Sequence, residues 1–162
     1  MVLLEQSNAS SVRLLNSLQT YMNPTSKPDG FPDLPLTTDD EFRKLELMLS
    51  EKAADNPNGR KEPALAYTYL KGRLSTIGGA DQRSCVMNIL KFVMTNQLAM
   101  SYNWKGLHNK KSFEKTKLRE VITEAAKVQF RGKESLDAAI KEAIQSWLKL
   151  AKSRHVYGST KK

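Results

Sequence analysis

Apolar side chains recur every three or four residues along most of this chain, a spacing that places them on one face of an α-helix. No stretch alternates apolar and polar residues for long enough to predict a β-strand. At 162 residues the chain is long enough for one domain with a hydrophobic core. We therefore predict an all-α fold, a compact bundle of about six or seven short helices in segments 1–22, 38–49, 63–77, 81–94, 95–102, 112–128 and 135–148.

Helix boundaries are marked by capping residues and by glycine. Thr38 followed by Glu41 forms a capping box, and the sixth helix is expected to begin near Ser112 or Thr116. The Gly78-Gly79 pair is predicted to end the third helix, because glycine adopts the left-handed backbone of a helix terminus at little cost. The periodicity predicts burial of Phe42, Leu45, Met48, Leu49, Leu65, Tyr69, Leu70, Leu74 or Ile77, Val86, Ile89, Leu90, Val93, Leu98, Ala99, Tyr102, Leu118, Val121, Ile122, Ala125, Val128, Leu136, Ile140, Ile144, Trp147 and Leu148.

Prolines and glycine concentrate between residues 23 and 35, where they interrupt helix formation. We therefore expect four parts. An N-terminal helix over 1–22 could pack on the domain or mediate self-association, and residues 23–35 form a Pro-rich linker. Residues 36–154 form the main helical domain, and residues 155–162 form a disordered basic tail.

Residues that carry catalytic or metal chemistry are few. Cys85 is the only cysteine, and His108 and His155 are the only histidines; their spacing matches no zinc site. The Gly78-Gly79 pair lacks the lysine and the preceding strand of a phosphate-binding loop. We predict no enzyme activity, no cofactor and no metal site, with Cys85 a buried core residue in a reducing compartment. No apolar run is long enough to span a bilayer and no signal peptide is recognisable, so we expect an intracellular protein without membrane contact.

The positive charge of the chain is concentrated in its second half. Residues 1–80 hold nine basic and ten acidic side chains, whereas residues 81–162 hold 17 basic and seven acidic ones. A basic face raises the local concentration of polyanions, of which nucleic acid is the commonest inside cells. Lysines that served only solubility would be expected on both halves. The asymmetry therefore favours a nucleic-acid partner.

The densest basic segment is 103–119, with six basic residues and one acidic residue. It joins a polar loop to the first turn of a helix, where free backbone N–H groups favour an anion such as phosphate. We expect its lysines to neutralise phosphates, while Arg119, Asn103, His108 and Asn109 have the donors and acceptors to reach base edges. The alternative is a solvated loop whose lysines only solubilise. The predicted DNA-binding residues are Lys105, His108, Asn109, Lys110, Lys111, Lys115, Lys117, Arg119, Arg131, Lys133 and Arg154.

Trp104 lies in the same loop, beside Gly106. Its ring could stack on a base. A lone tryptophan next to a glycine more often tucks under its loop and holds it against the core, and we favour that interpretation.

Two resemblances are carried by particular residues. The order Gly78-Gly79, Trp104-x-Gly106, Lys111-x-Phe113 and Trp147-Leu148 resembles a domain-of-unknown-function family that is common in arthropod proteins, over about residues 34–154. More loosely, the spacing Phe113-x-x-x-Lys117-Leu118 resembles the BEN domain, an all-helical DNA-binding module, and Arg154 stands where that family ends in a helix bearing an arginine. Glu114 stands where that family has Asp, and the proline of its motif is missing. This second resemblance implies a BEN-like fold in a nuclear protein that contacts duplex DNA through basic loops and the last helix.

From charge and resemblance together we predict a nuclear DNA-binding module of chromatin or transcription regulation. It is expected to contact double-stranded DNA through the basic loop and helix N-terminus around 103–119. The alternative is an interaction module, in a chromatin or transposon-derived protein, that binds a protein partner or self-associates through residues 1–22.

Overall fold

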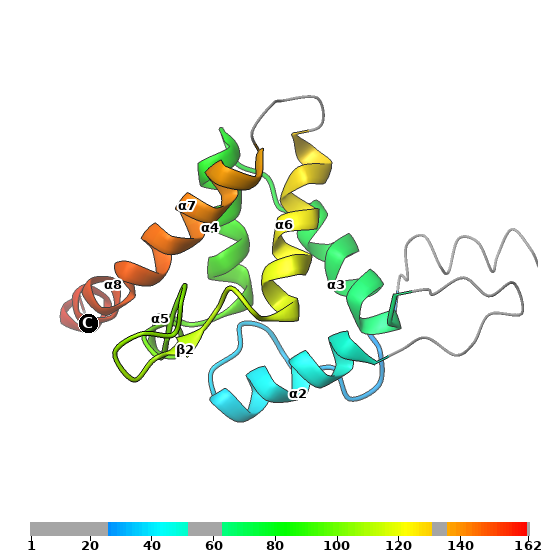
Figure 1. The fold of residues 1–162 in the computed structure, drawn as a ribbon, viewed down its shortest axis with the longest axis horizontal. Coiled ribbons are helices and arrows are strands. Elements are labelled where there is room, and N and C mark those ends of the chain that lie inside the picture. The colour runs from blue at the N-terminus through cyan, green and yellow to red at the C-terminus, as the bar shows by residue number, and fades with distance from the viewer. Residues whose placement is uncertain (1–25, 52–62, 131–135, 162) are drawn as a thin grey trace, which may run out of the picture.

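The computed structural model describes residues 26–51, 63–130 and 136–161. Within these ranges the chain is all-α, as predicted, with the helices arranged around one hydrophobic core (Figure 1). The predicted helix over 1–22 and the predicted site residues Arg131 and Lys133 lie outside the described residues. The seven helices in the described ranges are α2 (Asp39–Ser50), α3 (Leu65–Ser75), α4 (Gln82–Val93), α5 (Asn96–Ala99), α6 (Lys117–Gln129), α7 (Leu136–Lys149) and α8 (Ala151–Thr160).

Several helices begin at a side chain that accepts a hydrogen bond from the first turn. Thr38 and Glu41 form the predicted capping box of α2: the Glu41 N–H donates to Thr38 Oγ1 (3.2 Å), and the Glu41 carboxylate accepts from the Thr38 N–H (3.3 Å). Of the two starts predicted for the sixth helix, Thr116 is the cap, with the Arg119 N–H donating to its Oγ1 (3.1 Å). Each cap satisfies a backbone donor that the helix leaves unpaired.

Helix α6 is the central element of the core. It packs against α2, α3, α4 and α7, and in Figure 1 it lies between α3 on one side and α4 and α7 on the other. Leu118, Val121, Ile122 and Ala125 of α6 are fully buried, as predicted. Burial of each branched side chain contributes about 1.5–3 kcal/mol. Helix α4 also packs along α7, which completes the core on that side.

Two residues predicted to be buried are exposed. Leu65 is 57% exposed because it begins α3, whose buried face consists of Ala66, Leu70 and Leu74, four residues apart. Val128 is 36% exposed near the end of α6, where Ala125 and Ala126 take the buried positions. In both helices alanine extends the core face, and the apolar pattern alone does not distinguish it from its larger neighbours.

The described part of the predicted linker, residues 26–35, is attached to the core. Phe31 is buried and its ring meets the edge of Tyr69 at a centroid distance of 5.1 Å. At the end of the segment, the Leu36 N–H donates to the Val93 carbonyl (2.7 Å), and the Thr95 N–H donates to the Leu36 carbonyl (3.0 Å). The segment is not helical, as the prolines predict, but it still packs against α3 and the end of α4.

The structure also contains two short strands and a last helix that the sequence did not predict. Strands β1 (Tyr102–Asn103) and β2 (Lys111–Ser112) pair in parallel around the basic loop. Helix α8 covers residues expected to be disordered from 155 onward. Its first turn is anchored by Arg154, whose guanidinium lies 4.3 Å from the Trp147 ring centroid and donates from Nε to Asn96 Oδ1 (2.9 Å).

The Gly78-Gly79 pair has a different role from the predicted helix end. Helix α3 ends at Ser75, before the pair, and neither glycine has a left-handed backbone. Gly79 instead passes close to the start of α4: a Cβ there would lie 2.7 Å from Cys85 Cα and 2.8 Å from the Ser84 carbonyl carbon. Glycine is therefore required at 79 by the close approach of two backbones.

This close approach predicts that Gly79→Ala destabilises the fold by roughly 1–3 kcal/mol, the typical cost of forcing extra atoms into a packed site. Gly78→Ala is the matched control, because a Cβ at 78 would meet nothing within 4 Å. Urea unfolding followed by circular dichroism would measure both. Equal stability of the two variants would contradict the proposed role of Gly79.

Candidate nucleic-acid interface

The basic loop between β1 and β2 is held in one conformation by hydrogen bonds to the Asn103 side chain. Asn103 Oδ1 accepts from the N–H groups of Gly106 (2.6 Å) and Leu107 (3.0 Å), and its Nδ2 donates to the Leu107 carbonyl (2.8 Å). Gly106, His108 and Asn109 all have positive φ angles. Gly106 is also pressed against β2, since a Cβ there would lie 2.9 Å from the Ser112 nitrogen. Asn103 therefore shapes the loop, and its amide is not free to read a base edge as the sequence had suggested.

Three of the predicted phosphate-binding lysines are engaged in ion pairs. Lys105 Nζ lies 3.0 Å from Glu114, Lys117 Nζ lies 3.1 Å from Glu120, and Lys111 pairs with Asp39. The side-chain hydrogen bond from Lys105 and its charge lower the pKa of Glu114, and the hydrogen bond from Lys111 does the same for Asp39. A neighbouring carboxylate offsets the charge of each of these lysines, although Asp39 also pairs with Arg43, so they attract a polyanion less than their number suggests.

Lys110 and Lys115 are exposed and have no ion pair among the described residues. Lys110 lies in the loop, and Lys115 lies just before the cap of α6. The positive charge of these two surface lysines is therefore not offset by an ion-pair partner among the described residues.

The N-terminus of α6 is occupied by a carboxylate of the protein itself. Glu46 of α2 accepts from the N–H groups of Lys117 and Leu118, both at 2.8 Å, while Thr116 takes the N–H of Arg119. Burial raises the pKa of Glu46, against the two backbone hydrogen bonds that lower it. The sequence had suggested that these N–H groups would be free for phosphate. They are already hydrogen-bonded, so this end of the helix offers no anion site.

Two of the three predicted arginines, Arg119 and Arg154, are partly structural. Arg119 is partly buried and donates from Nε to the Glu114 carbonyl (3.1 Å). Arg154 is stacked on Trp147 in the junction between α7 and α8, and burial lowers the pKa of its guanidinium. Neither lies free on the loop surface. Arg154 is separate from the loop cluster in the sequence and joins α8 to the core.

Helix α7 brings further cations to the loop. A hollow of about 390 Å³ lies between the loop and α7, with Trp104, Leu107 and Leu148 as its apolar part. Its polar lining consists of Asn103, Lys105, His108, Lys110, Gln145 and Lys149. Lys149 is exposed and has no ion pair among the described residues. The lining of the hollow thus combines apolar side chains with lysines and contains no carboxylate.

Sequence reasoning missed the contribution of α7. Lys141, Gln145 and Lys149 are spaced by four residues and therefore share one exposed helix face. That spacing is visible in the sequence, but the position of this helix face opposite the loop depends on how α7 packs on β1 and α4.

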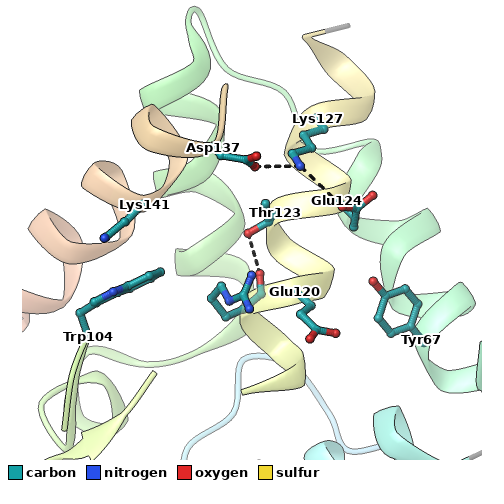
Figure 2. Close-up of a pocket in the computed structure, with 9 residues that line it drawn as sticks. Tyr67, Trp104, Glu120, Thr123, Glu124, Lys127, Asp137 and Lys141 are labelled. Carbon is teal, nitrogen blue, oxygen red and sulfur yellow. Dashed lines mark hydrogen bonds and ion pairs between the residues drawn. The ribbon is translucent and has the colours of Figure 1, made fainter. Parts of the chain in front are cut away.

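A second hollow of about 440 Å³ lies on the other side of Trp104, between α6 and α7 (Figure 2). Its charges are balanced: Arg119, Lys127 and Lys141 line it together with Glu120, Glu124 and Asp137. Lys127 Nζ lies 2.7 Å from Asp137 and 3.8 Å from Glu124, as the dashed lines in Figure 2 mark. Balanced charge gives this hollow little attraction for a polyanion.

Trp104 separates the two hollows. It is partly buried and packs against the core, which confirms the packing interpretation. Lys141 Nζ lies 5.5 Å from its ring centroid, within range of a cation–π interaction. Figure 2 shows Lys141 of α7 on the Trp104 side of the hollow. The ring therefore provides a contact between the loop and α7.

The described residues bring together no group of three metal-ligating side chains, and none of the described helices is long and apolar enough to cross a membrane. Cys85 is fully buried, as predicted. No protein-family model, curated protein or solved structure matches this chain.

The contact between Glu46 and α6 predicts that Glu46→Ala lowers the free energy of unfolding by about 1–2 kcal/mol, because two backbone donors of α6 lose their acceptor. Glu51→Ala is the matched control, since Glu51 is exposed at the end of the same helix and its side chain makes no hydrogen bond among the described residues. Thermal unfolding of both variants would test this. A Glu46→Ala variant as stable as the control would rule out the capping role.

Proposed function

We propose that this chain is a DNA-binding module that acts in the nucleus, in chromatin or transcription regulation. The observation that carries the proposal is the hollow between the basic loop and α7. Lys110 and Lys149 come from two separate elements and flank the same surface, and neither has an ion pair among the described residues. Cations that converge without a carboxylate partner provide a favourable site for phosphates.

The surrounding charge supports the same proposal. Residues 81–162 carry an excess of basic over acidic side chains, 17 against seven, and this half supplies both the loop and α7. His108 and Asn109 stand at the tip of a loop whose backbone is fixed by Asn103. A fixed loop orders its side chains before binding, which lowers the entropic cost of forming the complex.

The proposal modifies the interface expected from the sequence. We assign the phosphate contacts to Lys110 and Lys149, with Lys105 and Lys141 nearby. The N-terminus of α6 is not part of this interface, because the Glu46 carboxylate already accepts its backbone N–H groups. The resemblance to the BEN domain stays a prediction.

Charge reversal tests the assignment. Lys110→Glu and Lys149→Glu are each expected to weaken binding to a mixed-sequence duplex roughly tenfold or more and to reduce the slope of log affinity against log salt by about one. Fluorescence anisotropy titrations at several salt concentrations would measure both effects.

Lys44→Glu is the matched control, because Lys44 is exposed on α2 and has no ion pair among the described residues. It makes the same change in net charge away from the hollow. An equal loss in all three variants would indicate attraction by overall charge only. Unchanged binding by the two hollow variants would place the interface elsewhere.

A further inference from the structure

The hollow between the loop and α7 has an apolar component that phosphate contacts leave unexplained. Lysines on a flat surface are sufficient to bind the backbone of a duplex. Here the cations surround Trp104, Leu107 and Leu148 in a hollow of about 390 Å³, which falls within the roughly 300–1,000 Å³ typical of small-molecule sites. A ligand that fills this hollow and contacts its whole lining must present a flat or apolar group as well as negative charge.

Leu107 shows that the apolar component is held in place. Its side chain is 59% exposed, yet both of its backbone polar groups are hydrogen-bonded to the Asn103 amide. Gly106 on one side and His108 on the other adopt positive φ angles that complete this turn. An exposed leucine on a fixed backbone loses little conformational freedom on binding, which favours contact with another apolar surface.

Two other hollows, each larger than this one, are lined by carboxylates. The one in Figure 2 is lined by three carboxylates, which repel phosphate. A third, of about 470 Å³ beside α2, contains Glu46 and Asp39, and its cations Arg43 and Lys111 both pair with Asp39. The hollow at the loop combines apolar contact area with cations that are not neutralised by a lining carboxylate.

From these observations we propose that the hollow holds one unstacked nucleobase, at a position where the bound nucleic acid is single-stranded or locally unpaired. This inference rests on the proposed function and specifies the ligand of the same site. The base lies against Leu107 and the Trp104 ring, and the phosphates on either side of it meet Lys110 and Lys149. The Gln145 amide and His108 at the rim supply hydrogen-bonding groups of the kind that read an exposed base edge.

Anisotropy with three labelled probes tests the inference: a fully paired duplex, the same duplex with one unpaired nucleotide, and one of its strands alone. We expect the bulged duplex and the single strand to bind roughly tenfold more tightly than the paired duplex, as for burial of one base. Equal affinity for all three would overturn the inference and leave the DNA-binding proposal standing. Failure of all three to bind would overturn both.

Leu107→Ser separates the apolar contact from the charge. It is expected to remove the preference for the unpaired probes and to leave affinity for the paired duplex unchanged. Leu47→Ser is the matched control, because Leu47 is 70% exposed on α2 and does not line this hollow. A preference that survives Leu107→Ser would contradict the placement of the base.

Excess adenosine monophosphate distinguishes a base in a strand from a free nucleotide. We expect it to leave the bulged duplex bound, because the free nucleotide has no second phosphate for the opposite lysine. Displacement of the probe would assign the hollow to free nucleotides and overturn the inference.

Discussion

Burial of α6 is the constraint on which the rest of the structure depends. Its apolar face is fully buried, and α2, α3, α4 and α7 all pack against it. Its first turn is held by Glu46, a residue 71 positions from Lys117 in the sequence. Because the donors at that end are satisfied by α2, the position of α6 and the position of α2 are fixed together. The loop that leads into α6 is thereby placed against α7.

Acidic side chains also decide which positive charges of the basic segment are neutralised. Glu46, Glu114, Glu120 and Asp39 each take up a backbone donor or a lysine in the segment that the sequence identified as most basic. Within that segment Lys110 and Lys115 are the lysines left without an ion pair among the described residues, and the hollow beside α7 brings together Lys110 and Lys149. A count of basic residues therefore overstates how many lysines are available to a polyanion. The ion pairs formed in the folded chain show which of them remain available.

Local signals in the sequence predicted most of the fold. The capping box at Thr38, the apolar period of α4 and α6, and the burial of Trp147 depend on residues within a few positions of one another. Predictions failed where the packing of one element against its neighbour decided the outcome. Gly79 is constrained by the start of α4, and α8 extends the chain from a turn that Arg154 anchors on Trp147. Neither contact has a signature in its own segment.

The sequence by itself determined the all-α class, the main helix boundaries and the concentration of positive charge after residue 81, because these follow from periodicity, capping and composition. Only the tertiary structure decided which of those charged side chains form ion pairs and which do not. An ion pair or a helix cap forms between side chains that folding brings within about 3 Å of each other, whatever their separation along the chain. Asp39 reaches Lys111, Glu46 reaches α6, and Lys149 comes to lie opposite Lys110 for that reason.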